Sequence, residues 1–363
     1  SLDMLVEKLY DMHPRGVTAL GPALTVAVGM ASESPGSKII ICTDGVANVG
    51  VGNISANDVQ FYTKIANLAR SKGVAISVIS MEGENCSVEH LGTAADISGG
   101  SVEIVDPLQL GSKVSAMLSK QVIATNLSGE ILLSPHLKFT ETEQTEENNN
   151  ANSNNTESST KNLVLGSVTD ETDTGFMFDW RQSFRQEFEK KYETLDFDAS
   201  KTLADVLPSG KIVFQAQLDY LDASGQKTKK VITCEAPVKH LREEVEKDIN
   251  STVIAVCAIQ HAAKLAQLGN YDEARIHLVS TQRLLQRGMK TTRHQKDYMS
   301  YIVQAEKLDQ FMREAQQYEA MVKSDRKSLT ASAEIRKAER DDDASKSIFQ
   351  MKALNVKTFN ERL

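Results

Sequence analysis

The first third of the chain alternates between helical and strand patterns of apolar residues. Small and aliphatic side chains recur at helical spacing over residues 19–31, and continuous apolar runs lie at 38–43, 74–79 and 102–105. Runs without polar alternation are typical of parallel strands covered on both faces, and helices between them predict right-handed crossovers. Residues 1–122 are therefore predicted to form a partial doubly wound parallel sheet. Because such domains usually have about five or six strands, we expect this one to begin upstream of Ser1.

The pattern changes after Ile123. Two segments, 123–139 and 162–180, have extended patterns, and 211–221 with 227–236 predicts a hairpin around the Asp222-Ala223-Ser224-Gly225 turn. Apolar and polar residues alternate in the first hairpin arm, which indicates one solvated face. We predict an antiparallel β-sandwich over residues 123–239. Its residues 141–161, rich in Asn, Glu, Ser and Thr, are expected to form a flexible loop.

From Leu241 to about Ala320 the apolar spacing is helical. Residues 253–259 are apolar on all sides, which predicts a central buried helix, and two more helices follow. Residues 240–322 are predicted to be a helical domain of antiparallel helices. The segment 323–363 is charged and is expected to be a partly ordered tail. The predicted fold class is thus multi-domain, α/β plus β plus α.

Composition favours a globular protein without a nucleic-acid partner or a transmembrane helix. The 363 residues are 40% hydrophobic and 25% charged, as in soluble globular proteins, and the net charge is −8. Without a concentrated basic stripe we expect no nucleic-acid partner. No apolar stretch approaches the roughly 20 residues of a transmembrane helix, and the start lacks the features of a signal peptide. The four cysteines show no Cys-x-x-Cys pair and are expected to be buried free thiols, which predicts a cytoplasmic protein.

Two oxygen-bearing side chains are candidate metal ligands. Asp44, in Thr43-Asp44-Gly45, follows a predicted buried strand, at the sheet end where α/β proteins bind ligands. Thr18 precedes the helix before that strand. Magnesium prefers hydroxyl, carboxylate and water oxygens, so Thr18 and Asp44 are predicted to bind Mg²⁺. The alternatives are that Asp44 caps the next turn and that Thr18 only starts the helix.

Motifs for catalysis or nucleotide binding are missing from the sequence. Gly45 and Gly50 have the outer spacing of a phosphate loop, but Val51-Gly52 follows where Lys and Ser or Thr are needed. The seven histidines are scattered, and no Gly-x-Ser-x-Gly elbow occurs. We therefore predict no catalytic residues, no organic cofactor and no enzymatic activity.

The Gly16-Val17-Thr18 loop and the Thr43-Asp44-Gly45 turn resemble two elements of the metal-ion-dependent adhesion site of the von Willebrand factor A family. The resemblance covers residues 1–122. The family's third element, an Asp-x-Ser-x-Ser run after its first strand, does not occur within residues 1–122 and would lie upstream. The resemblance implies a site that is incomplete in this chain, in which a carboxylate of a protein partner completes the metal shell.

The order of the three regions is also similar to known proteins. An A domain, a β-sandwich and a helical domain resemble the inner coat subunits of the coat protein complex II. They also resemble cytoplasmic A-domain proteins fused to a circularly permuted Ras-like GTPase, which we favour because Thr18 and Asp44 are kept. We predict a non-enzymatic protein-binding module. The alternatives are a coat-like scaffold without metal dependence, which could associate peripherally with membranes, and a regulatory segment of a larger GTPase-containing protein.

Overall fold

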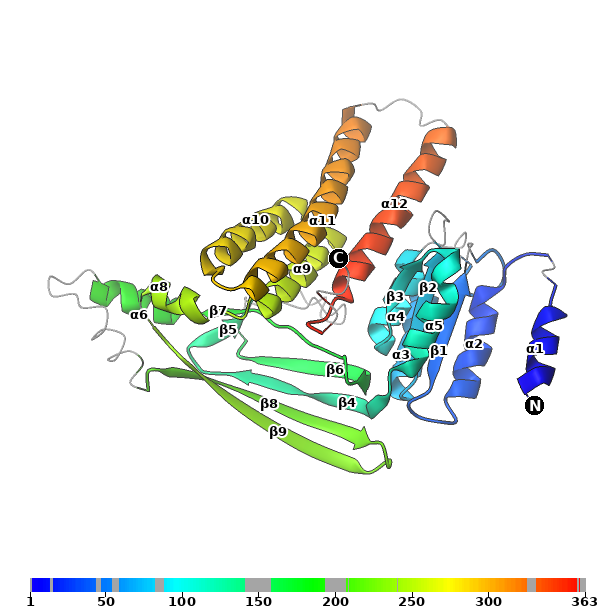
Figure 1. The fold of residues 1–363 in the computed structure, drawn as a ribbon, viewed down its shortest axis with the longest axis horizontal. Coiled ribbons are helices and arrows are strands. Elements are labelled where there is room, and N and C mark those ends of the chain that lie inside the picture. Colours follow the sequence, from blue (N-terminus) through cyan, green and yellow to red (C-terminus); the bar gives the residue numbers. More distant parts are fainter. Residues whose placement is uncertain are drawn as a thin grey trace.

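The computed structural model (Figure 1) describes the greater part of the chain. Along the sequence it consists of three regions that differ in secondary structure. A parallel sheet with helices comes first, antiparallel sheets follow, and long helices come last. This arrangement confirms the predicted fold class. The described residues are 2–13, 16–43, 47–53, 59–81, 88–140, 158–192, 207, 209–239, 241–324, 331–357 and 359.

The parallel sheet is three-stranded, with the order β1-β2-β3. Ile76 and Ile79 of its central strand are both fully buried, although they lie in different apolar clusters, one with α2, α3 and α4 and the other with α5. Helices therefore cover both faces, which explains the continuous apolar runs. The elements are α1 (Leu2–Tyr10), α2 (Leu20–Ala31), β1 (Lys38–Thr43), α3 (Val59–Ser71), β2 (Ala75–Met81), α4 (Val88–Ser98), β3 (Val102–Val105), η2 (Pro107–Gln109) and α5 (Leu110–Ser119).

Two antiparallel sheets follow, one with the order β6-β4-β8-β9 and one with the order β5-β7. The predicted hairpin is β8-β9, and in its turn the Asp222 carboxylate accepts hydrogen bonds from the N–H groups of Ser224 and Gln226 at 2.8 and 2.9 Å. Helix α6 was not predicted. The elements are β4 (Val122–Leu133), β5 (Leu137–Phe139), β6 (Thr160–Thr169), β7 (Phe178–Trp180), α6 (Gln182–Tyr192), β8 (Lys211–Asp222) and β9 (Lys227–Pro237). Of the expected loop 141–161, residues 141–157 lie outside the described residues.

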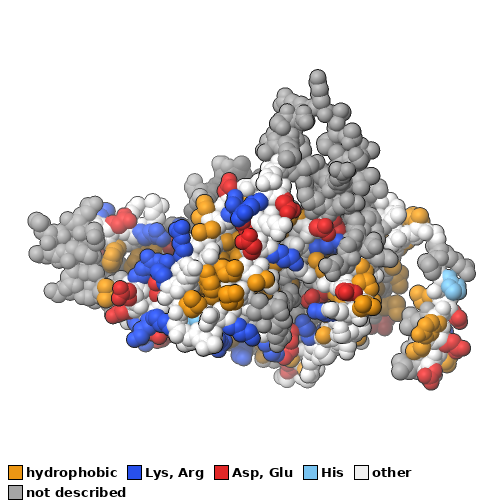
Figure 2. Space-filling view, turned by 45° about the horizontal axis from the view of Figure 1, so that its top comes forward, with side chains coloured by type: hydrophobic (Ala, Val, Ile, Leu, Met, Phe, Trp, Pro, Cys, Tyr) orange, Lys and Arg blue, Asp and Glu red, His pale blue; other side chains and the backbone are white. Residues whose placement is uncertain are grey.

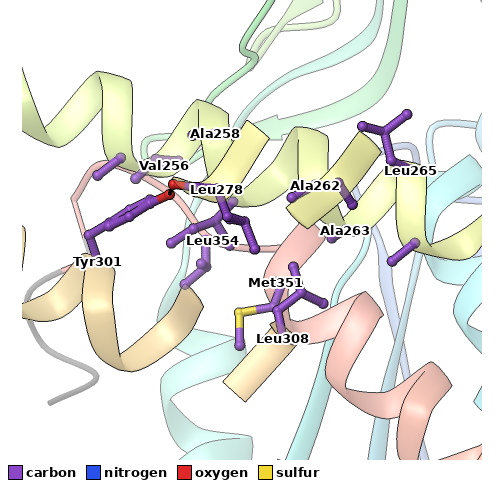
Figure 3. Packing of buried hydrophobic residues seen from close by; sticks show 14 of the residues in the cluster. Val256, Ala258, Ala262, Ala263, Leu265, Leu278, Tyr301, Leu308, Met351 and Leu354 are labelled. Carbon is purple, nitrogen blue, oxygen red and sulfur yellow. Dashed lines mark hydrogen bonds between the residues drawn. The ribbon is translucent and has the colours of Figure 1, made fainter. Parts of the chain in front are cut away.

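The helical region has α9 at its centre, as predicted. Ala255, Ile259 and Ala262 of α9 are fully buried in one apolar cluster with α10, α11 and α12. Figure 3 shows Tyr301 of α11 pointing towards Leu278 of α10, whose carbonyl oxygen accepts a hydrogen bond from the Tyr301 hydroxyl at 2.7 Å. The elements are α8 (Arg242–Val245), η3 (Glu246–Asp248), α9 (Ser251–Gln267), α10 (Tyr271–Gly288), α11 (Thr292–Ser324) and α12 (Ala331–Lys352).

Helix α12 differs from the predicted charged tail at 323–363. It lies between α11 and the parallel-sheet region (Figure 1) and packs on both α4 and α9. Phe349 enters the apolar cluster of the parallel-sheet region, whereas Met351, Leu354 and Phe359 enter that of the helical region. The expectation failed because the many charged residues of 331–346 precede an apolar segment, and this segment is buried by the parallel-sheet region and the helical region together.

The cysteines also differ from expectation. Cys42 and Cys234 are exposed and Cys257 is half-buried, all as free thiols, while Cys86 lies outside the described residues. Side chains alternate along a strand, so the buried Ile41 and Thr43 leave Cys42 between them on the other face of β1. The expectation of buried thiols is therefore wrong for Cys42 and Cys234.

Candidate functional site

Thr18 lies in the loop that leads into α2. The helix begins at Leu20, and its N-cap residue is Ala19, which makes no side-chain capping bond. The Thr18 side chain is exposed, and its hydroxyl does not cap the helix.

The backbone of Thr18 joins this loop to the segment that follows β1. The Thr18 carbonyl oxygen accepts hydrogen bonds from the N–H groups of Asn48 at 2.9 Å and Val49 at 3.2 Å. Both donors come shortly after Thr43, the last residue of β1. The Thr18 loop is therefore in direct contact with the segment that begins a few residues after β1.

Further residues fix the segment 47–53 in place. A Cβ atom at Gly21 would lie 1.8 Å from the carbonyl oxygen of Val51, so only glycine lets this loop approach α2. The buried Tyr62 of α3 donates its hydroxyl hydrogen to the carbonyl oxygen of Gly52 at 2.9 Å. Sequence reasoning missed both Gly21 and Tyr62. The closely spaced glycines after β1 were the one available signal that the chain turns tightly here.

Asp44 lies outside the described residues, together with positions 45 and 46. Thr43 before it is buried and pairs in register with Ser80 of β2. Ser80 is fully buried, and its hydroxyl oxygen has no hydrogen-bond partner among the described residues. The carboxyl ends of parallel strands lie at one edge of a sheet, so a second hydroxyl is present at the edge where β1 ends.

The donor set can be compared with what magnesium requires. A hydroxyl such as that of Thr18 suits Mg²⁺, which also needs carboxylate and water oxygens in octahedral geometry. Within the described ranges, no group of three or more His, Cys, Asp or Glu side chains is placed to hold a metal ion. These residues therefore fit one hydroxyl ligand of a magnesium site, and the carboxylates would have to come from Asp44 and from elsewhere.

Two residues of β1 have a shifted pKa: partial burial raises the pKa of the Cys42 thiol, next to Thr43, and the other shifted group lies at the opposite end of the strand. Burial, and secondarily the charge of Lys120, lowers the pKa of Lys38, whose ammonium group donates to the carbonyl oxygens of Met117 at 3.2 Å and of Lys120. Lys38 begins β1 and Thr43 ends it, so this cation does not act on the Thr18 loop.

Comparison with known proteins gives one relative by sequence. No known protein family matches the chain. The chain is similar to circularly permutated Ras protein 1 of Dictyostelium discoideum, at 25% identity over 315 residues, which are 85% of this chain and 34% of that protein. The chain thus spans about a third of the length of the curated relative it matches.

Several solved structures match the chain in fold, among them the following two. The human COPII-coat protein Sec24c aligns over 99% of this chain and 46% of its own, with a TM-score of 0.55 at 12% identity. The ArnB paralog VWA2 from Sulfolobus acidocaldarius aligns over 95% of this chain and 72% of its own, with a TM-score of 0.43 at 15% identity. The predicted resemblance to coat subunits and to proteins with a circularly permuted Ras-like part is confirmed, the former in fold and the latter in sequence.

Membrane-spanning character was assessed for the described helices. None of them alone is both long and apolar enough to cross a bilayer. The consecutive segments Arg242–Asp248 and Ser251–Gln267 together have sufficient length and apolar character, but they are bent by 96° at their junction. Most side chains of α9, the second of these segments, are buried within the helical region.

Proposed function

We propose that this chain is a non-enzymatic, cytoplasmic protein-binding scaffold that uses a metal-dependent adhesion site of the von Willebrand factor A type. One observation carries the proposal: the Thr18 carbonyl oxygen accepts hydrogen bonds from the N–H groups of Asn48 and Val49. This contact brings the loop of the predicted hydroxyl ligand to the segment that follows the predicted carboxylate ligand. Ligands on loops supported by a rigid sheet and two helices suit a preorganised site.

In this proposal, Thr18 and Asp44 supply two of the magnesium ligands, and residues upstream of Ser1 supply others. A carboxylate of the partner protein completes the octahedral shell. Recognition through such a bridge makes and breaks no covalent bond. Tight fixation of the segment 47–53 by Gly21 and Tyr62 lowers the entropy that the loop would lose on binding.

Calorimetry tests the metal site. Magnesium or manganese is titrated into this chain and into a chain extended upstream by the preceding strand, each with the natural sequence, Asp44→Ala or Thr18→Ala. We expect a binding heat in the extended protein that Asp44→Ala abolishes and Thr18→Ala weakens at least about tenfold, or about 1.4 kcal/mol. Asp11→Ala, which removes an exposed carboxylate after α1, serves as the control. If the extended protein gives no heat that depends on Asp44, the metal bridge is wrong.

A coat-like scaffold without metal dependence is the second candidate. It is supported by the fold similarity to the human COPII-coat protein Sec24c over 99% of this chain. In this case partners dock on the sheet edge and the helical region, and peripheral association with membranes would not need Thr18 or Asp44. Liposome sedimentation of the natural protein and of the Thr18→Ala/Asp44→Ala double variant distinguishes this candidate from the first. Only a metal-independent scaffold keeps its liposome binding in the double variant.

A regulatory segment of a larger GTPase-containing protein is the third candidate. It is supported by the similarity to circularly permutated Ras protein 1, of which the matching part is 34%. Sequencing the gene on both sides of this segment tests it directly. A Ras-like coding region in the same reading frame would support it, and flanking stop codons would refute it.

A further inference from the structure

Helices α10 and α11 form a groove on the outer face of the helical region. Its volume is about 660 Å³, and apolar side chains of both helices line it. Ile276 and Val279 of α10 are 70% and 48% exposed, and Ile302 of α11 lies opposite them. Figure 2 shows hydrophobic side chains gathered on this part of the surface, bordered by Lys and Arg. Large aliphatic side chains exposed together in a hollow indicate a contact surface.

Acidic side chains at one end of the groove already have ion-pair or hydrogen-bond partners within the protein. Asp309 forms an ion pair with Arg275 at 2.6 Å and a second with Arg313. Asp272 accepts a hydrogen bond from the side-chain amide of Gln316 at 2.9 Å. This end therefore presents groups that are paired within the protein.

The other end, towards the α10–α11 turn, is basic. Arg283 lines the groove and is exposed, and the stretch 283–296 contains Lys and Arg but no Asp or Glu. Arg287 is bound to Glu246 at 2.9 Å. The other four form no ion pair with a residue in the described ranges: Arg283, Lys290, Arg293 and Lys296. Two acidic lining residues, the exposed Glu306 on the α11 wall and Asp272, likewise form no ion pair with a residue in the described ranges.

We propose that this groove binds an amphipathic helix of a partner protein, with the apolar face of that helix on Ile276, Val279 and Ile302 and its carboxylates next to Arg283. A groove between two antiparallel helices is the geometry that accepts a third helix through anchors at i, i+3, i+4 and i+7. Unpaired cations at one end complement acidic side chains and fix the direction of the bound helix. A hollow surface favours a peptide over a membrane, which would need a projecting apolar face. Because Thr18 and Asp44 are not involved, failure of this proposal leaves the metal site untouched.

Fluorescence anisotropy with a designed peptide tests the groove. The probe is a fluorescein-labelled helix of about 18 residues, with Leu at i, i+3, i+4 and i+7 and Glu gathered at one end. The control peptide carries Lys in place of each Glu. We expect the Glu peptide to bind the full chain with a Kd of about 10 µM and the Lys peptide at least about tenfold more weakly.

Three variants locate the site. Ile276→Glu and Arg283→Glu should each weaken binding of the Glu peptide at least about tenfold. Leu108→Glu, at a side chain that is 94% exposed and outside the groove, should leave binding unchanged. Arg283→Gln, which removes the charge with little change in shape, repeats the test if the reversal disturbs folding. Absence of binding, equal binding of both peptides, or indifference to the groove variants overturns the proposal.

A vesicle experiment separates the membrane alternative. Vesicles of phosphatidylserine and phosphatidylcholine are sedimented with the natural protein, Ile276→Glu and Leu108→Glu. If only Ile276→Glu loses vesicle binding while the Glu peptide does not bind, the surface recognises lipid and the helix proposal is wrong. Peptide binding that depends on Ile276, without vesicle binding, supports it.

Discussion

Gly92 of α4 lies against the ring of Phe349 of α12, so closely that a Cβ atom at residue 92 would be 2.5 Å from two ring carbons. The same two helices meet at both sides of this contact. Asp342 accepts a hydrogen bond from the Val88 N–H at 2.6 Å, and Lys352 forms an ion pair with Asp96. Residues spaced by four along α4 thus contact α12, and these contacts join the parallel-sheet region to the last of the described helices.

Gly92→Ala should destabilise the protein by about 1–3 kcal/mol, because the added methyl group overpacks the site. Phe349 is only 2% exposed and cannot turn away. Gly111→Ala in α5 is the control, since nothing lies within 4 Å of its Cβ position. Alanine there should stabilise by up to about 1 kcal/mol through helix propensity. Urea unfolding measures both, and equal shifts in the two variants would contradict the packing argument.

Asp342→Ala should cost about 3–5 kcal/mol, because it breaks a buried ion pair from one side. The Asp342 and Lys346 side chains are 3% and 4% exposed, and their charged atoms are 2.9 Å apart. The variant leaves the Lys346 ammonium with Asp343 at 3.6 Å and removes the acceptor of the Val88 N–H. The double variant Asp342→Leu/Lys346→Met should lose clearly less in urea unfolding. A double variant as unstable as Asp342→Ala would show that the Lys346 charge, left without Asp342, is not the cause.

Gly21→Ala should displace the segment 47–53, because the added Cβ atom meets the Val51 backbone, which cannot rotate away. We expect a loss of at least about 2 kcal/mol in the free energy of unfolding. Hydrogen exchange at the N–H groups of Asn48 and Val49 should accelerate as their bonds to Thr18 weaken. Gly29→Ala in the same helix has open space at its Cβ position and should leave exchange at both groups unchanged.

His277 should make stability depend on pH below neutrality. Burial, with a smaller contribution from the nearby His261, lowers the pKa of His277 to about 4, and the two ring centres are 4.9 Å apart. The unfolded chain takes up this proton near its ordinary value of about 6.5. Stability is therefore fully present above that value and declines as the pH falls from about 6.5 to about 4.

Unfolding of His277→Phe across this range measures the effect. The variant should show a flatter stability profile than the natural protein between pH 4 and 6.5, since it cannot take up the proton. His13→Gln, at an exposed histidine after α1, is the control. An undiminished slope in His277→Phe would assign the pH dependence to other groups.

The parallel sheet could be predicted because its signal is local. A strand covered on both faces needs apolar residues throughout, so β1 and β3 were placed with the bounds that the structure shows. Helix α6 is mostly polar and charged, and only Phe184, Phe188 and Tyr192 recur in it at helical spacing, so it escaped prediction. Cys42 was misplaced because an apolar run does not reveal which of its faces a helix covers.

The candidate site was predicted only in part. Thr18 and Asp44 were chosen for the chemistry of their side chains. The contact of the Thr18 loop with Asn48 and Val49 is made by backbone hydrogen bonds, which cannot be predicted from residue type. The groove on α10 and α11 was missed for a similar reason. Its apolar residues have ordinary helical spacing, and whether they face a core or solvent depends on what packs above them.

By itself, the sequence determined the order of the three regions, the strands of the parallel sheet and the central position of α9, because each depends on periodicity within a short window. The tertiary structure alone decided the place of α12. Ten of the 22 residues of that helix are charged, and its local pattern resembles a solvated tail. Phe349 packs against Gly92, Asp342 bonds to Val88, and Met351 enters the cluster of the helical region, so segments far apart in the sequence bury this helix together.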